Sequence, residues 1–264
     1  SIDRLREEIL TNASQTKSRY DIVACDLPWF GEMAEAGHFL AIDKLMEETA
    51  FASDDFHPEA LASARYKGAQ YGLPVQTTPE LLVYRRDVFD EHGLNPPRTI
   101  AETLHAAKTI HDPFHSMAGI AWNGARGTPL GHSFLFVIAA FGQPVLDLRK
   151  TPDGFDGENV EGDNFRPMFD TAEARQAADY LQELLHYSPR GILNMSWFER
   201  ARCYADGDAA MAYNATLLAP LFETDQASPA YGKTEYLPHP HGPAGRPIAP
   251  LGGYALAIPS NIAS

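Results

Sequence analysis

The chain has 264 residues, and 44% of them are hydrophobic, which is typical of a globular protein with a packed core. The formal net charge is −14, and because an acidic surface repels phosphate backbones, this charge argues against nucleic-acid binding. The longest uninterrupted apolar run, Phe134 to Phe141, is far shorter than the ~20 residues that a membrane-spanning helix needs.

Helix-like and strand-like segments alternate along the chain, and this alternation predicts an α/β fold. In the first third the predicted elements are, in order, a helix over residues 2–10, a strand over 20–25, a helix from Pro28 to Gly37, two short strands around a turn at 66–72, a strand over 81–84 and a helix from Asp87 to Gly93. Proline near the start of the second helix and glycine at its end follow the usual asymmetry of helix termini.

Two later helices begin with a capping box, in which a Thr or Ser and a Glu three residues on satisfy each other's free backbone amides. Thr99 and Glu102 open the first of these helices, which ends near His111. Ser196 and Glu199 open the second. We therefore expect both helices to start at these residues.

The clearest helix of the chain spans residues 171–187, where Ala and Leu side chains recur at three- and four-residue spacing on one face. The remaining predicted elements are a strand over 119–122, a loop over 124–127, a buried helix over 134–141, a surface excursion over 147–164, a strand over 209–213, a short helix over 217–222, an extended loop over 238–250 and a strand over 254–258. Residues 1–19 offer no strand, and the last strand has no following helix. Both ends therefore read as cut, as though the chain were the middle of a longer protein.

Motifs for catalysis and metal binding are weak. The chain contains no nucleophile elbow, P-loop or dinucleotide-binding glycine pattern. His111 and His115 have the spacing of helical zinc ligands, but Pro113 between them breaks the helix. His239 and His241 form a loop pair without a third ligand, so solvated loop histidines are the simpler interpretation.

A glycoside hydrolase needs two carboxylates placed across a cleft. Asp26 and Glu199 are the candidates, although Glu199 already has a capping role and Asp26 stands alone at a strand end. The two cysteines, Cys25 and Cys203, read as buried small hydrophobic residues, and a disulfide between them stays open as the alternative.

Aromatic, amide and hydroxyl residues recur where predicted strands end or helices begin. In α/β sheets ligands bind beyond the carboxyl ends of the strands, and aromatic faces with polar neighbours suit sugars. The candidate binding residues are Asp26, Trp29, Gln76, Thr77, Thr78, Trp122, Asn123, Trp197, Tyr213, Asn214 and Tyr254. Each has a simpler alternative, since a Trp can fill a core and an Asp before Pro can form a turn.

Four stretches, taken together, resemble the extracellular solute-binding proteins of bacterial ABC importers, in the sugar-binding group that is similar to maltose-binding protein. They read YDIVACDLPWFGEMAEAGHFLAIDKL, YGLPVQTTPELLVYRRDVFDEHGLNPPRTIAETLHAAK, ARCYADGDAAMAYNATLLAP and PLGGYALAIPSNIAS. The resemblance implies an α/β, two-lobed periplasmic-binding-protein-like fold with an interlobe cleft. The first lobe, residues 1–112, would lack its leading strands, residues 113–250 would form the second lobe, and residues 251–264 would be a hinge crossing back.

The resemblance also implies roles for individual residues. Tyr254, after Gly252 and Gly253, would stack on a sugar, while Asp26 and Trp29 would face the cleft. The polar segment 76–78 would also face the cleft. Where the family often carries a Trp, this chain has Tyr213 and Asn214. Arg126, in the glycine loop 124–127, supports a competing interpretation in which the ligand is a sugar acid or another anion.

The function that the resemblance implies is binding without catalysis and without a cofactor. The ligand would be a sugar or polyol, the protein partners would be the membrane permease subunits of an ABC importer, and the location would be periplasmic or extracellular. The first residues, Ser1 to Arg4, do not form the basic segment that opens a signal peptide, which a mature chain would have lost. The incomplete first lobe would leave a sheet edge exposed, and a homodimer could cover it.

Overall fold

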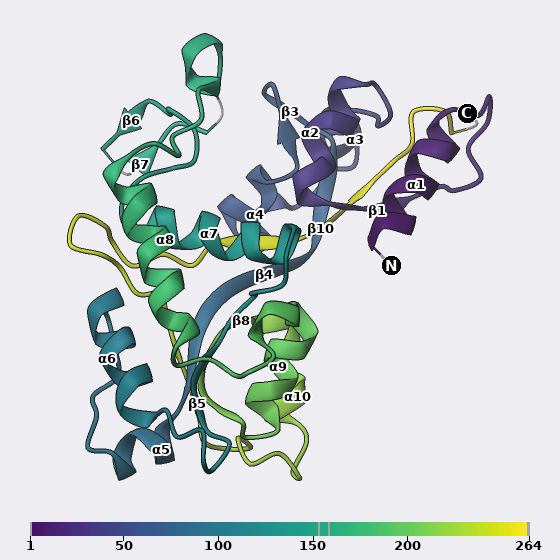
Figure 1. The fold of residues 1–264 in the computed structure, drawn as a ribbon. Coiled ribbons are helices and arrows are strands. Elements are labelled where there is room, and N and C mark those ends of the chain that lie inside the picture. The colour runs from purple at the N-terminus through teal and green to yellow at the C-terminus, as the bar shows by residue number, and fades with distance from the viewer. Residues whose placement is uncertain (1, 153, 158, 263–264) are drawn as a thin grey trace. The chain divides into compact units, whose positions relative to one another are not determined.

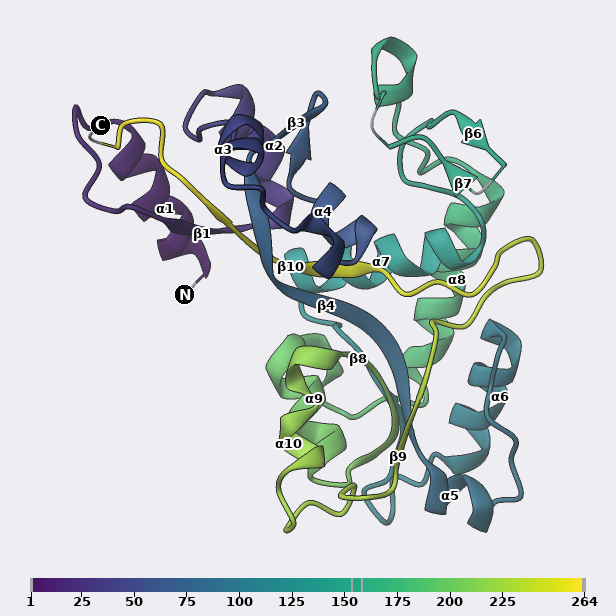
Figure 2. The same cartoon turned by 180° about the vertical axis from the view of Figure 1, so that it is seen from behind.

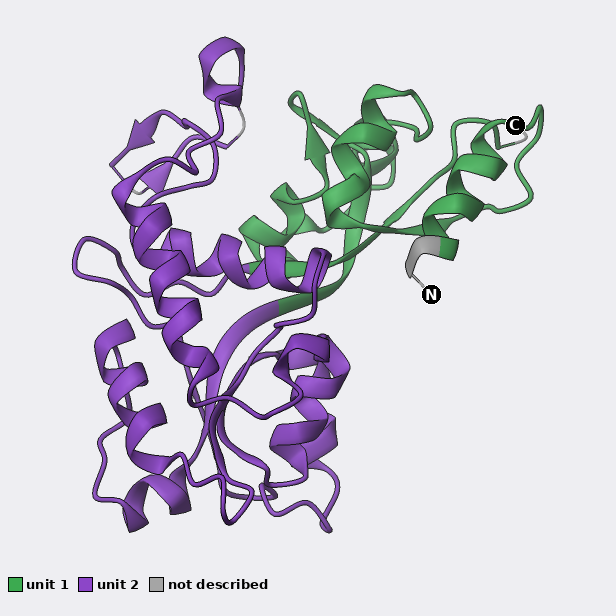
Figure 3. Cartoon of the chain, in the orientation of Figure 1, with its two compact units in different colours: residues 1–78, 251–264 green, residues 79–250 purple. Residues whose placement is uncertain are grey.

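A computed structural model describes residues 2–152, 154–157 and 159–262 (Figures 1 and 2). The other residues, at the two ends of the chain and at 153 and 158 in the expected surface excursion, lie outside this description. The chain divides into two compact units (Figure 3): unit 1 comprises residues 1–78 and 251–264, and unit 2 comprises residues 79–250. The expected boundary at residue 112 therefore falls inside unit 2.

Unit 1 is built around three strands in the order β1 (Val23–Asp26), β10 (Leu251–Ala257) and the first part of β4 (Gly72–Arg85). β1 and β10 are antiparallel, so that Val23 pairs with Ala257 and Asp26 with Tyr254. Two strands that are far apart in the sequence are thus neighbours. This pairing fixes which side chains meet at the end of β1.

The helices of unit 1 are α1 (Ile2–Ala13), α2 (Leu27–Glu35), α3 (Asp43–Glu48), the 3₁₀ turn η1 (Ser53–Asp55) and α4 (Pro58–Ala62), followed by a hairpin of β2 (Arg65–Tyr66) and β3 (Ala69–Gln70). Of these helices, α1 and α2 contribute buried residues to the core. Phe30 and Met33 of α2 pack with Val23 and Cys25 of β1. α2 starts directly after β1 with proline in its first turn, so Asp26 is both the last strand residue and the helix N-cap.

Unit 2 contains a sheet in which the second part of β4 pairs with β8 (Ala209–Ala215) on one side and β9 (Thr234–Leu237) on the other. β5 (Ala118–Ala121) is parallel to β8, while β4 is antiparallel to both of its partners. All seven residues of β8 are buried. Its small, mostly alanine side chains allow helices to approach both faces, as in other sheets covered on two sides.

The remaining elements of unit 2 are α5 (Arg86–Glu91), α6 (Ile100–Ile110), α7 (Thr128–Ala140), the hairpin β6 (Lys150–Thr151) and β7 (Gly154–Phe155), η2 (Gly162–Phe165), α8 (Ala172–Leu185), η3 (Ile192–Asn194), α9 (Trp197–Ala205), η4 (Thr216–Leu218) and α10 (Pro220–Glu223). One core cluster joins the sheet to α6, α7 and α8. A second joins it to α9 and α10. Unit 2 is therefore a three-layer α/β unit, which confirms the predicted fold class. α5 and α6 belong to it because Phe89 and Ile110 pack in the first cluster.

Most predicted elements form, and the differences have local causes. Both capping boxes form, and α8 ends within two residues of its predicted end. β4 is ten residues longer than the predicted strand, because Pro74 and Pro79 interrupt its sequence pattern. α7 starts six residues earlier than predicted, with proline in its first turn, and its Leu135 is exposed rather than buried. Within the described residues, no helix combines the length and apolar character that crossing a membrane requires.

Candidate functional site

The carboxyl edge of the unit 2 sheet gathers polar side chains. β5 and β8 are parallel, so their carboxyl ends meet at one edge, and β4 enters the unit there with Glu80 opposite Ala215. Ala121 pairs with Ala212, and Asn123 and Asn214 each follow this pair by two residues. Both predicted amide residues thus lie at one edge of the sheet, and both are buried.

A buried ion pair lies at this edge. The Glu80 carboxylate contacts Nη1 of Arg200, and the two residues are only 3% and 1% exposed. Arg200 occupies the buried face of α9 with Ala201 and Tyr204. Removing a buried charge pair from water costs free energy that the mutual attraction offsets only when further hydrogen bonds complete the arrangement.

His132 of α7 contacts the Asn123 amide and the Trp197 ring, and the charges of the ion pair act on it. The Asn123 amide nitrogen lies 3.2 Å from His132 Nδ1, and the His132 ring meets the Trp197 ring edge-on at 5.5 Å. Burial lowers the pKa of His132 to about 4; the Glu80 charge opposes this effect and the Arg200 charge adds to it. His132 is therefore neutral at pH 7.

Several buried polar atoms of this edge have no hydrogen-bond partner. Apart from Oε1 of Glu80, which lies in the ion pair, they are Oδ1 of Asn123, Oδ1 and Nδ2 of Asn214, and Nε and Nη2 of Arg200. An unsatisfied buried group costs about 1–3 kcal/mol, so five in one cluster would be expensive without a partner of another kind. We call Glu80, Asn123, Arg200 and Asn214 the polar cluster.

Two further predicted residues of unit 2 belong to its core. Trp122 is buried, and its indole Nε1 donates to Ser188 Oγ at 2.8 Å. Tyr213 is buried, shares a 2.6 Å hydrogen bond with the Tyr180 hydroxyl, and stacks on His239 with ring centroids 4.3 Å apart. Both side chains are thus occupied by protein contacts, and neither presents a free face.

The other predicted residues of unit 2 are more accessible. Trp197 is half-buried at the first position of α9. Arg126 is exposed in the loop that precedes α7, where the Ala125 amide donates to Met195 O. Trp197 lies beside the polar cluster through His132, whereas the described contacts do not connect Arg126 to the cluster.

In unit 1 the pairing of β1 with β10 brings two predicted residues together. Asp26 lies directly opposite Tyr254. Burial raises the pKa of Asp26, and burial together with the Asp26 charge raises the pKa of Tyr254. Gly253 has a φ of +137°, and a Cβ there would lie 1.9 Å from Gln76 O. This glycine is required because β10 and β4 approach so closely.

The remaining unit 1 candidates differ in exposure. Trp29 packs against the core of this unit while staying half-buried, and Gln76 is also half-buried. Thr77 is exposed and its neighbour Thr78 is buried. The exposure of residues 76–78 thus changes from one residue to the next along β4, as expected of a strand.

The alternative interpretations can also be placed. Glu199 is held in its capping box by the Ser196 backbone amide at 3.1 Å, and its pKa is lowered by the Ser196 hydroxyl. This is the opposite of what a general acid needs. Cys25 and Cys203 are both free and buried, and burial raises the pKa of each thiol to about 12. Within the described residues, no cluster of three or more His, Cys, Asp or Glu side chains is arranged to hold a metal ion.

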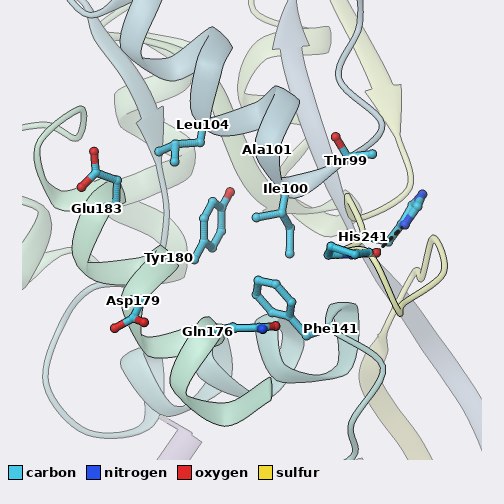
Figure 4. Close-up of a pocket in the computed structure, with 12 residues that line it drawn as sticks. Thr99, Ile100, Ala101, Leu104, Phe141, Gln176, Asp179, Tyr180, Glu183 and His241 are labelled. Atoms are coloured by element: carbon cyan, nitrogen blue, oxygen red, sulfur yellow. Dashed lines mark hydrogen bonds between the residues drawn. The ribbon is translucent and has the colours of Figure 1, made fainter. Parts of the chain in front are cut away.

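Unit 2 also has a cavity of about 620 Å³ between α6, α8 and residues 241–243 (Figure 4). Ile100, Phe141 and the Tyr180 ring surround its centre, and Asp179 and Glu183 lie on its α8 side. The lining is largely apolar and contains none of the predicted binding residues. This cavity therefore offers few partners for the hydroxyl groups of a sugar.

Sequence reasoning missed three residues of the edge: Glu80, His132 and Arg200. A signal for two of them was present. Glu80 is the only charged residue in the run Thr77 to Tyr84, and Arg200 lies at a position where the spacing of α9 requires an apolar side chain. A charge on a buried position is rare unless it is paired. Their partnership depends on packing between α9 and β4, which no sequence spacing encodes.

Comparisons with known proteins agree with this architecture. Residues 2–263 match the family described as bacterial extracellular solute-binding protein. A mannitol-binding protein of Pseudomonas aeruginosa is 24% identical over 262 residues, which are 97% of this chain and 56% of that protein. The chain belongs to the bacterial extracellular solute-binding protein family.

Solved structures show the same fold. A solute-binding protein from Agrobacterium radiobacter K84 in complex with ribitol superposes with a TM-score of 0.84 at 23% identity, covering 99% of this chain and 63% of that one. Maltose-bound MalE3 from T. maritima superposes with a TM-score of 0.81 at 25% identity, covering 100% and 63%. The chain thus spans between half and two thirds of the length of these relatives.

Proposed function

We propose that this chain is part of the solute-binding component of a bacterial ABC importer that binds a sugar or polyol and delivers it to membrane permease subunits. The observation that carries the proposal is the polar cluster beside Trp197 at the carboxyl edge of unit 2. Membership of the solute-binding family supports it. The ligands named for similar proteins, which are mannitol, ribitol, maltose and tagatose, also support the proposal.

The chemistry of the cluster suits hydroxyl groups. A hydroxyl both donates and accepts, and the unpaired atoms of Asn123, Asn214 and Arg200 include donors and acceptors. The Trp197 ring supplies a flat apolar face for the C–H surface of a sugar. The side chains of Trp122 and Tyr213 hold the sheet edge in place from the core.

Unit 1 provides the second group of proposed binding residues. Asp26 and Tyr254, which pair across two strands, offer a carboxylate and an aromatic ring. Trp29 and the segment 76–78 complete this group, and Gly253 permits the close strand approach beside them.

The proposed role is binding without turnover, in the periplasm or outside the cell. Glu199 does not suit acid catalysis because Ser196 lowers its pKa. We leave the expected homodimer out of the proposal, because no observation on the described residues supports it. The sugar-acid alternative rests on Arg126, which is exposed in its loop.

The proposal is tested by isothermal titration and thermal shift with mannitol, ribitol, tagatose and maltose. We expect at least one to bind; a micromolar Kd corresponds to about 8 kcal/mol. Trp197→Ala should weaken binding at least tenfold, roughly 1.4 kcal/mol, because it removes the aromatic face. Phe198→Ala, which changes an exposed aromatic residue on the same helix, is the matched control. Absence of binding to all four compounds, or release of sugar from maltose, would contradict the proposed function.

A further inference from the structure

The polar cluster combines an ion pair with unpaired groups, and this combination bears on the charge of the ligand. Glu80 neutralises Arg200 through a contact at Nη1. Nε and Nη2 of the guanidinium, together with the Asn214 amide and Asn123 Oδ1, remain without partners. The cluster is thus nearly neutral overall, yet it is rich in unused hydrogen-bonding capacity.

We propose that the Glu80–Arg200 pair makes the binding site selective for neutral polyhydroxylated ligands over the corresponding sugar acids. This inference rests on the proposed function and assigns its specificity to two residues. Arg200 donates to ligand hydroxyls, and Glu80 cancels the positive charge that would otherwise attract a carboxylate. Asn123 and Asn214 complete the set of donors and acceptors.

Hydrogen-bond matching supports a neutral ligand. The unpaired donors are Arg200 Nε, Arg200 Nη2 and Asn214 Nδ2, and the unpaired acceptors outside the ion pair are Oδ1 of Asn123 and Oδ1 of Asn214. A polyol hydroxyl can pair with either kind. A carboxylate only accepts, so the group that replaces the terminal hydroxyl can pair with the donors but not with either amide oxygen.

The strongest argument for an anion is the geometry of Arg200. Nε and Nη2 present two N–H groups on one edge of the planar guanidinium, which suits a carboxylate that accepts both. Glu80 removes this advantage, because a second carboxylate beside Arg200 would be repelled by the first. The ligand carboxylate would also lose its hydration without gaining a net opposite charge.

Arg126 does not alter this balance. It is exposed in its loop, where solvent and salt screen its charge. Arg200, in contrast, is almost fully buried, so its interactions are screened little. The residue that decides the charge preference is therefore the arginine paired with Glu80.

The experiment compares matched pairs of ligands that differ only at one terminal carbon: mannitol with mannonate, and ribitol with ribonate. Titration calorimetry is performed on the wild type, Glu80→Gln and Arg200→Met. For the wild type we expect the acid of each pair to bind at least about tenfold more weakly than the polyol. Glu80→Gln should shift this ratio toward the acid by at least about tenfold, since it leaves Arg200 uncompensated. Arg200→Met should weaken polyol binding about tenfold.

Two further variants keep the test decisive. Arg202→Gln removes an exposed charge from the same helix and should leave the ratio unchanged. A single change in a buried ion pair can impair folding, so the double variant Glu80→Leu/Arg200→Met is included because it removes both charges. This variant should bind polyols weakly and still bind the acids more weakly than the polyols. Near-ultraviolet circular dichroism confirms that each variant is folded.

The outcomes separate the inference from the proposed function. If no compound binds, the proposed function fails and the inference falls with it. If polyols bind but acids bind equally or more tightly, the function stands and the inference is overturned. The inference is also overturned if folded Glu80→Gln retains both the polyol affinity and the polyol-to-acid ratio of the wild type. Should Glu80→Gln not fold, the same result for the folded double variant overturns it. In either case the unpaired atoms would be satisfied by internal water alone.

Discussion

Replacing His239 by phenylalanine should make the protein less sensitive to acid. His239 is buried, its ring stacks on Tyr213, and burial lowers its pKa from 6.5 to about 4. The backbone contact with Pro240 and the charge of Glu80 oppose this effect, while His132 adds to it. The imidazole is therefore neutral in the folded protein near pH 7.

The sign and size of the effect follow from proton linkage. Between pH 6.5 and about 4 the unfolded chain carries a proton on this histidine and the folded protein does not, so acid favours unfolding. The contribution is fully present above pH 6.5 and is lost as the pH falls to about 4. A pKa difference of this size corresponds to about 3 kcal/mol of stability.

The assay is urea unfolding, without ligand, at several pH values from 7.5 to 4.5. The wild type should lose stability over this range more steeply than His239→Phe, by up to about 3 kcal/mol. Phenylalanine keeps a flat ring against Tyr213 and cannot titrate. His105→Phe, an exposed position on α6, is the control and should follow the wild type. Parallel pH curves for His239→Phe and the wild type would refute the reasoning.

Three other changes test separate features of the structure by urea unfolding. Glu80→Gln should destabilise the fold by about 3–5 kcal/mol, and the double variant Glu80→Leu/Arg200→Met should recover most of this loss. A double variant as unstable as Glu80→Gln would contradict a charge-based cost. Gly253→Ala should reduce the free energy of unfolding by at least about 2 kcal/mol, because its φ is +137° and its Cβ would lie 1.9 Å from a backbone oxygen. The control Gly252→Ala, whose Cβ would lie 3.9 Å from the nearest atom, should cost far less. Equal effects would argue against this close strand approach. Thr99→Ala should cost about 1 kcal/mol by removing one half of a capping box, and a neutral result would show that the helix start is held by other contacts.

Local sequence signals predicted local structure well. The capping boxes at Thr99 and Ser196 gave correct helix starts because the bonds involved join residues three apart. The sequence also predicts the turn between β2 and β3, where Lys67 and Gly68 both adopt positive φ in the structure. β4 was underestimated because its two prolines resemble strand breaks. β9 and the β6–β7 hairpin gave no recognisable pattern.

The candidate site was predicted only in part. The sequence indicates Asn123 and Asn214 individually as polar residues at strand ends, and each follows the last pair of the β5–β8 register by two residues. Trp122 was singled out by the same rule, yet it fills the core and donates to Ser188. Glu80 and Arg200 were overlooked, because a charged residue in an apolar pattern carries no indication of its partner.

The sequence by itself determined the α/β class, the starts of α6 and α9 and the family resemblance that the comparisons confirm. These properties depend on hydrophobic periodicity and on contacts within a few residues. Tertiary structure decided the division at residues 78 and 79, the pairing of Asp26 with Tyr254, and the assembly of the polar cluster from β4, β5, β8 and α9. The reason is that side chains far apart in the sequence meet only when strands pair and a helix packs across the sheet edge.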